Sequence, residues 1–172
     1  MPLMSPLPRD STSAETAALL AAHADEHGHF AALREAFAYF PAALRALDNQ
    51  YDLIIGQGRL DRGLRELVFA CAASARGDDY LARAMAAQAA AHGFTGTGAV
   101  LAMAASGEGR SDAETCLLTW ARKMATTPYK AVERDMERLH SAGWRDQEIV
   151  EALTVVSLSA YMSVMSLTLK LA

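Results

Sequence analysis

The sequence predicts an all-α protein, and three observations support this fold class. Apolar residues recur at the three- and four-residue spacing of amphipathic helices, whereas no stretch shows the two-residue alternation of a half-buried strand. Capping residues and glycines divide the chain at helix-length intervals. The composition, with 52% hydrophobic and 21% charged residues, is typical of a globular chain, and 172 residues suffice to bury one core.

Composition also bears on domain organisation and location. Residues 1–13 are expected to form a flexible N-terminal arm, and residues 14–172 a single domain. The net charge of −4 disfavours nucleic acid and an acidic membrane surface as partners. The N-terminus lacks the basic and apolar regions of a secretory signal, and the apolar run Ile149 to Leu171 contains Glu151 and Lys170. We therefore expect a cytoplasmic protein that does not span a membrane.

The N-terminal third predicts three helices. Thr12 to Glu15 has the pattern of a capping box, which would start a helix that runs to about Ala24. Apolar residues at helical spacing predict a second helix over Phe30 to Phe40. Pro41 suits the first position of a third helix, Ala42 to Ile55, which the following Gly-Gln-Gly would end.

Three histidines follow the first predicted helix. His23 and His27 are one helical turn apart and could share a metal ion with Asp25 or Glu26, and His29 is close by. The alternative is a polar helix end that Gly28 closes, with His29 at the start of the next helix. Nothing else nearby completes a ligand set, so no metal is expected.

A pair of helices, residues 61–93, is the centre of the predicted fold. Asp61 caps the first helix, the turn Ala75-Arg76-Gly77 ends it, and Asp78 caps a second helix, Asp79 to His92. Glu66 is an isolated carboxylate within the apolar run of the first helix, on the side of Ala70 and Ala73. Such a pair is where an all-helical protein of this size would hold a site.

The remainder predicts four more helices and a weak internal repeat. They are expected at Thr97 to Ser106, from a capping box at Ser111 to Thr126, at Pro128 to His140, and from Asp146 to the C-terminus. Gly93-Phe94 matches Gly143-Trp144 at an offset of about 50 residues. The chain is therefore expected to be a bundle built from two related helical halves.

The two cysteines, Cys71 and Cys116, lie among apolar neighbours in different predicted helices. They have no CxxC or metal-ligand spacing. A reactive thiol would need a helix N-terminus or a cationic neighbour, and neither is evident, so both are interpreted as small buried side chains.

Taken together, the residues of the central pair resemble a known family. The run Arg65-Glu66-Leu67, then Gly77-Asp78-Asp79-Tyr80-Leu81-Ala82-Arg83-Ala84-Met85 and Gly93, is similar to the alkylhydroperoxidase D (AhpD) and carboxymuconolactone decarboxylase superfamily, and most similar to its peroxidase-related branch. The resemblance covers about Ala24 to Ala172, and order and spacing agree throughout. It implies an all-α, AhpD-like helical bundle.

The resemblance assigns roles to individual residues. The family pattern is Arg-Glu-Leu followed by Cys-x-Tyr-Cys-x-x-Ala-His. On it, Glu66 falls at the proton-relay glutamate, Asp78 and Leu81 at the two cysteines, and Met85 at the histidine, while Tyr80 keeps its family position. The family's peroxidase-type redox chemistry needs both thiols, so the resemblance implies an alkylhydroperoxidase-related protein that has become redox-inactive.

Three functions remain open for a chain with this pattern. The favoured one is a non-redox enzyme on a small organic acid or lactone, with Glu66, Asp78 and Tyr80 as catalytic residues and burial raising the pKa of one carboxyl of a Glu66–Asp78 pair. Leu81, Met85 and Gln88 would line the pocket, and Arg83 would hold an acidic substrate if it faced that pocket. The alternatives are a small-molecule binding module and a structural protein whose site is filled by side chains.

Cofactors and assembly complete the set of expectations. Nothing in the sequence calls for a metal ion, a nucleotide, haem or flavin. The resemblance implies a homo-oligomer, a dimer, trimer or hexamer. The last helix, with Met162 and Met165, could serve that interface, and core packing explains it equally well.

Overall fold

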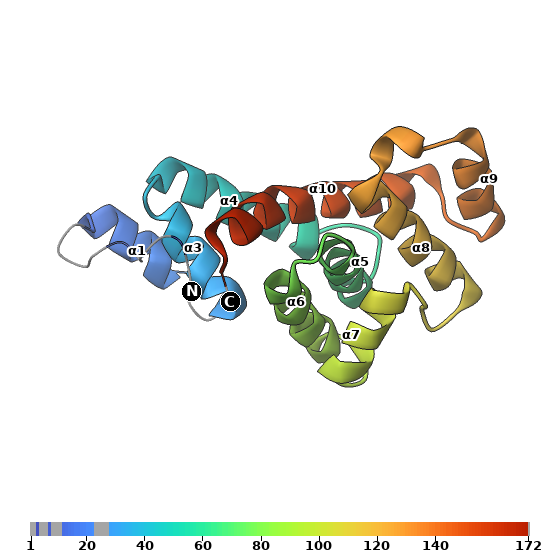
Figure 1. Cartoon of the computed structure of the whole chain (residues 1–172), viewed down its shortest axis with the longest axis horizontal. Coiled ribbons are helices and arrows are strands. Elements are labelled where there is room, and N and C mark those ends of the chain that lie inside the picture. The colour runs from blue at the N-terminus through green and yellow to red at the C-terminus, as the bar shows by residue number, and fades with distance from the viewer. Residues whose placement is uncertain (1–2, 4–6, 8–11, 23–27, 172) are drawn as a thin grey trace.

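The computed structural model describes residues 3, 7, 12–22 and 28–171, and in these residues it contains helices and no β-strand. Figure 1 shows their arrangement. The helices follow in the order α1 (Ala14–Ala22), η2 (Gly28–Phe30), α3 (Ala31–Phe37), α4 (Pro41–Gly56), α5 (Arg62–Ala75), α6 (Asp79–Ala91), α7 (Thr97–Ser106), α8 (Asp112–Thr126), η3 (Pro128–Lys130), α9 (Glu133–Ser141) and α10 (Asp146–Leu169). The short elements η2 and η3 are 3-10 helices. The predicted all-α fold class is confirmed.

Helix α5 forms the centre of the molecule, and α10 lies across it and extends from the region of α3 and α4 toward α8 (Figure 1). The residues of α5 from Gly63 to Ala73 are all buried, because α6, α7, α8 and α10 pack around them. The small residues of α5, Gly63 and the run from Ala70 to Ala73, let these neighbours approach closely. Helices α5 and α6 form an antiparallel hairpin, which has the most extensive contact of the helix pairs in the described residues.

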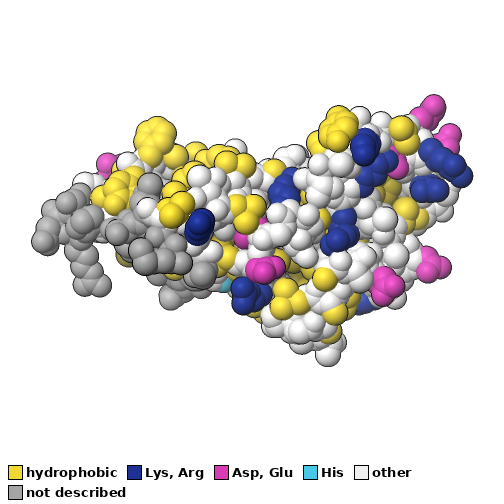
Figure 2. All heavy atoms as spheres, viewed as in Figure 1, with side chains coloured by type: hydrophobic (Ala, Val, Ile, Leu, Met, Phe, Trp, Pro, Cys, Tyr) yellow, Lys and Arg dark blue, Asp and Glu magenta, His cyan; other side chains and the backbone are white. Residues whose placement is uncertain are grey.

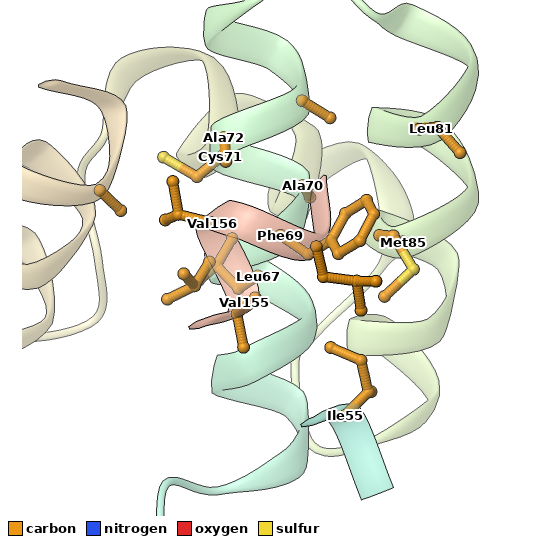
Figure 3. Close-up of a cluster of buried hydrophobic side chains, with 14 of the residues drawn as sticks. Ile55, Leu67, Phe69, Ala70, Cys71, Ala72, Leu81, Met85, Val155 and Val156 are labelled. Carbon is orange, nitrogen blue, oxygen red and sulfur yellow. The ribbon is translucent and has the colours of Figure 1, made fainter. Parts of the chain in front are cut away.

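The core lies between α4, α5, α6, α8 and α10. Figure 3 shows a part of it, in which Ile55, Leu67, Phe69, Val155 and Val156 belong to one buried cluster. The cluster also contains Leu81 and Met85 of α6, both fully buried. Two positions expected to line a pocket are therefore part of the hydrophobic core.

Most predicted caps are present. The Asp61 side chain accepts a hydrogen bond from the Leu64 N–H at 3.3 Å, and Ser111 does the same for Glu114 at 3.2 Å. At the first helix the cap is Ser13, whose Oγ accepts from the Thr16 N–H at 3.1 Å, rather than Thr12. The serine provides the same chemistry one residue later, so the helix is confirmed with a shifted start.

The predicted helix Pro128 to His140 is wrong, since the structure forms η3 and α9 instead. Val132 between them has extended backbone (φ −135°, ψ 158°). Its N–H donates to the Asp135 carboxylate at 2.9 Å, and Lys123 forms an ion pair with the same carboxylate. A side chain that accepts at a helix start favours a new helix over a continuous one. The predicted helix Phe30 to Phe40 is also shorter in the structure, where α3 begins at Ala31, ends at Phe37 and follows η2.

The two Gly-aromatic turns of the proposed repeat have the same geometry. Gly93 and Gly143 both have positive φ, at 103° and 96°. The Phe94 N–H donates to the Ala89 carbonyl at 3.1 Å, and 50 residues later the Trp144 N–H donates to the Leu139 carbonyl at 3.0 Å. These are matching helix ends of the Schellman type. They support the repeat at this point of the chain.

By length and composition α10 could cross a membrane, in contrast to the sequence expectation. Its most apolar 18-residue window has a mean hydropathy of 1.6, and 44% of that window is buried within the fold. Glu151, which was expected to interrupt the apolar run, accepts from the backbone N–H groups of Arg59 and Leu60 instead. The helix packs as a core element, and its polar residues serve that packing.

Candidate functional site

Glu66 lies in a fully buried position near the start of α5, with both carboxylate oxygens engaged. Arg62 Nε donates to Oε1 at 3.1 Å, and His92 Nδ1 lies 2.8 Å from Oε2. Gly63 lets the two helices meet here, because a Cβ at this position would lie 2.2 Å from the His92 carbonyl oxygen. The end of α6 therefore rests on the first turn of α5 and brings His92 to Glu66.

His92 is the functional candidate that sequence reasoning missed. It is the C-cap residue of α6, and 33% of its side chain is exposed. Because an ionised carboxylate only accepts, the imidazole donates through Nδ1, which leaves Nε2 as the nitrogen with a lone pair in the neutral ring. The signal was available, since two helices of 14 and 13 residues joined by a tight turn place the end of the second opposite the start of the first.

Tyr51 of α4 lies beside this pair in the interior. Its hydroxyl donates to Met85 Sδ at 3.7 Å, and His29 Nε2 lies 3.2 Å from the same oxygen. Burial raises the pKa of Tyr51, and the Glu66 carboxylate raises it further. The phenol therefore stays protonated, and together with Met85 it fills the space on the interior side of Glu66.

Asp78 lies at the other end of the hairpin, in the turn between α5 and α6. It is 1% exposed, and its Oδ1 accepts from the Leu81 N–H at 3.0 Å and from the Ser166 hydroxyl of α10 at 3.1 Å. Oδ2 has no hydrogen-bond partner among the described residues. Asp78 is thus a helix cap, as predicted, and it also ties α6 to α10.

The structure does not bring Glu66 and Asp78 into contact. Each carboxylate has its own partners, and the helical rise from Glu66 to the end of α5 separates them by about 13 Å along the axis. A shared-proton pair of the kind considered from the sequence needs two carboxyls in direct contact. The two residues belong to separate environments.

The other candidates lie along α6. The Tyr80 hydroxyl is buried near the backbone N–H groups of Ala32 and Leu33 and forms no hydrogen bond of good geometry with the described residues, and burial raises its pKa. Gln88 is half-buried. Arg83 is exposed and donates to the Asp79 carbonyl of its own helix, so it does not face the interior.

Four pockets lined by described residues lie away from the hairpin candidates. They have volumes of about 400 to 610 Å³ and are found between α1 and α3, between α8 and α9, between α1 and α4, and beside the start of α10. None of these four is lined by a candidate residue of the hairpin, namely Glu66, Asp78, Tyr80, Leu81, Met85 or Gln88.

The cysteines and the histidine cluster remain to be placed. Cys71 is fully buried and donates to the Leu118 carbonyl at 3.6 Å, and burial raises the pKa of its thiol to about 11, as expected for an inert side chain. Cys116 is half-buried, and burial raises its pKa too. His23 and His27 lie outside the described residues. Among the residues that the structure describes, no group of three His, Cys, Asp or Glu side chains is arranged to hold a metal ion.

Known proteins resemble this chain in structure. No protein-family model and no curated protein matches its sequence. An uncharacterized peroxidase-related protein from Silicibacter sp. TM1040 superposes with a TM-score of 0.84 at 19% identity, covering 99% of this chain and 91% of that one. An uncharacterized peroxidase-related protein from Ralstonia eutropha JMP134, described as an alkylhydroperoxidase AhpD core, gives 0.83 at 17%, covering 98% and 90%.

A third solved structure is a cysteine-to-alanine variant of the debrominase Bmp8 in complex with 2,3,4-tribromopyrrole. It superposes with a TM-score of 0.79 at 14% identity, covering 98% of this chain and 89% of that one. All three similarities extend over nearly the full length of the described fold. The chain therefore has the all-α, AhpD-like fold of the peroxidase-related proteins, as the sequence resemblance predicted.

Proposed function

We propose that this chain is a non-redox enzyme that transfers a proton on a small organic acid or lactone, with His92 as the base. The observation that carries the proposal is the 2.8 Å contact between His92 Nδ1 and the fully buried Glu66 carboxylate. A carboxylate that accepts from one imidazole nitrogen fixes the ring and its tautomer, and directs the basicity to the other nitrogen. The His92 side chain is 33% exposed, and the proposal requires that a substrate reach this nitrogen from the solvent side.

Arg62 adds a positive charge at the same place. Its Nε is engaged by Glu66, while 47% of the side chain is exposed. A guanidinium with free donors suits a carboxylate or a lactone carbonyl. This is the support for an acidic or lactone substrate, and it moves the binding role from Arg83 to Arg62.

The proposal places the chemistry at the solvent-facing end of the hairpin. Asp78, Leu81 and Met85 replace the two thiols and the histidine that the resemblance associates with redox chemistry, and Leu81 and Met85 are fully buried. The Cys71 thiol, with its pKa near 11, is a poor nucleophile at neutral pH. These facts support a non-redox function. They equally suit the two other readings, a binding module and a structural protein, which the experiment below separates.

The test compares His92→Asn with a matched control, His140→Asn. His140 also pairs with a carboxylate at 2.8 Å, that of Asp146, at an exposed site far from Glu66. Turnover of a panel of lactones and enol acids is measured by separating and quantifying substrate and product, because a proton transfer within the substrate releases no net proton. We expect His92→Asn to lose about 10²- to 10⁴-fold, the usual contribution of a general base, and His140→Asn to match the wild type.

A second variant, Glu66→Gln, keeps the shape of the side chain and removes its charge. It should lower kcat and shift the pH profile, because the imidazole loses the partner that orients it. Full turnover in His92→Asn would contradict the assignment. Absence of turnover across the panel would end the enzyme proposal, and ligand-induced thermal shifts without turnover would favour the binding module.

A further inference from the structure

The helix α10 has a second apolar face, which the fold leaves exposed. One face packs into the core through buried residues such as Val155, Leu158 and Met162. On the other face Val150, Leu153, Val164 and Leu167 are 41–67% exposed. A helix within a monomer usually presents charged and polar residues outward. This face therefore looks like a surface that another helix covers.

Six exposed or half-buried residues along this face of α10 follow a seven-residue repeat. The stripe consists of Val150, Leu153, Ser157, Ala160, Val164 and Leu167, with alternating steps of three and four residues. This is the spacing that lets two helices pack along a continuous seam. From first to last residue the stripe is about 26 Å long at 1.5 Å per residue. Met162 and Met165, considered for this role from the sequence, lie on the core side instead.

We propose that two copies of this chain pair through this stripe, with their α10 helices antiparallel about a twofold axis between Ser157 and Ala160. In this register Val150 of one copy meets Leu167 of the other, and Leu153 meets Val164. The small residues fall at the centre, where two helices that cross at a slight angle approach most closely. A twofold pair uses the same patch on both copies, so a self-complementary stripe is what it requires.

Charge favours the antiparallel direction. The first turn of α10 carries Asp146 and Glu148, and Lys170 follows its last turn. Antiparallel pairing places Lys170 beside the acidic first turn of the other copy and opposes the helix dipoles. Parallel pairing would instead align the two dipoles and place Lys170 of one copy beside Lys170 of the other.

Exposed apolar residues at the two ends of α10 would enlarge the interface. Hydrophobic side chains stand out on the upper edge of the molecule over α4 and over η3 (Figure 2). The exposed apolar residues of these elements include Leu53 of α4 and Tyr129 of η3, with Phe40 just before α4. An antiparallel pair brings the α4 end of one copy over the η3 end of the other. This helps to reach the roughly 800 Å² per partner that a standard interface buries.

The first test is the mass of the full chain in solution, measured by light scattering after size exclusion. The wild type should be a dimer, or a larger assembly built from dimers. Val164→Glu should raise the dissociation constant of the pair at least about 100-fold, because two charges enter an apolar seam. The control, Ala87→Glu, adds the same charge at an exposed position of α6 and should keep the wild-type mass. A monomeric wild type, or a Val164→Glu protein with unchanged mass and helicity, would overturn the proposal.

The second test reads the direction of the pair by oxidative cross-linking in a Cys116→Ser background. The double variant Leu153→Cys/Val164→Cys should form a covalent dimer, because the two positions face each other across the axis in the antiparallel register. Within one chain they are three turns apart and cannot bridge. The single variant Val164→Cys should stay uncross-linked. A covalent dimer of the single variant Val164→Cys would show that residue 164 faces its own counterpart, as in a parallel pair, and would refute the antiparallel register.

Discussion

The two ends of the α5–α6 hairpin each bury a carboxylate, but they hold it in different ways. At the α5 start, Glu66 has both oxygens engaged by side chains that reach solvent, Arg62 and His92. At the turn, the buried Asp78 carboxylate accepts hydrogen bonds from the Leu81 N–H and from the Ser166 hydroxyl. Glu66 thus has two partly exposed titratable side chains as hydrogen-bond partners, whereas the hydrogen bonds of Asp78 come from a backbone N–H and a buried hydroxyl.

This difference separates the two ends of the hairpin by the kind of partner that each carboxylate has. The turn end is where the resemblance places the thiols, and there the side chains now cap a helix and fill space. The opposite end pairs a buried carboxylate with the partly exposed imidazole of His92, the pair that the proposed proton transfer would use. The two ends of one hairpin therefore offer different chemical environments within the same fold.

The contrast would break if the space inside the hairpin were an open pocket, and truncation of Met85, in the middle of α6, tests this most strongly. Met85 is fully buried and contacts the Tyr51 hydroxyl. Met85→Ala should lower the free energy of unfolding by about 2–5 kcal/mol, because it leaves a cavity in a packed core. Met85→Leu, which nearly conserves the volume, should cost less than about 1.5 kcal/mol. Urea unfolding followed by circular dichroism measures both, and a cost near zero for Met85→Ala would indicate a pocket already open to solvent.

The role of Asp78 is sharpened by comparison with Asp61, the exposed cap of α5. Asp61→Ala should lose a cap alone, about 1 kcal/mol. Asp78→Ala should cost about 2 kcal/mol or more, because it also leaves the buried Ser166 hydroxyl without its acceptor. The double variant Asp78→Ala/Ser166→Ala should recover part of the loss. Equal costs for the two single caps would mean that the bond to α10 contributes nothing.

Much of the fold could be predicted because its signals are local. Asp61, Asp78 and Ser111 cap the helices that were assigned to them, since a cap depends on a few neighbouring residues. The break at Val132 was missed because it depends on Asp135, whose carboxylate also binds Lys123 of another helix. A sequence pattern of helical period does not report such a tertiary contact.

The site was harder to predict than the fold. The sequence singled out Glu66 by its isolation in an apolar run, and the structure places it in a fully buried ion pair. Its partner His92 ends a predicted helix, and the family pattern, which covers Asp78 and Met85, assigns His92 no role. The exposed stripe of α10 was missed for a similar reason: helical periodicity identifies an apolar face, but a helix with two apolar faces needs the packed structure to show which one is buried.

The smallest predicted effect concerns the ion pair of Arg110 and Glu114, which lies against Phe94, two residues after His92. Arg110 lies 3.8 Å from the centre of the Phe94 ring and donates to Glu114, at 2.8 Å from Oε1. Burial acts to raise the pKa of Glu114, but the hydrogen bonds from Arg110 outweigh it, and the pKa is lower than its ordinary value of 4.5. A lowered folded-state pKa stabilises the protein above the unfolded value, and this contribution is lost as the pH falls from about 4.5 through the folded value.

Glu114→Gln should therefore reduce stability at pH 7 by less than about 1 kcal/mol, because Arg110 is half-exposed and solvent screens the pair. The difference from the wild type should shrink when both are measured by thermal unfolding below pH 4. Arg110 covers Phe94, which follows the end of α6, whereas Asp78 lies at the start of that helix. The loss of unfolding free energy in Glu114→Gln should therefore add to the loss in Asp78→Ala. A difference that persists unchanged in acid would mean that Glu114 acts through packing rather than charge.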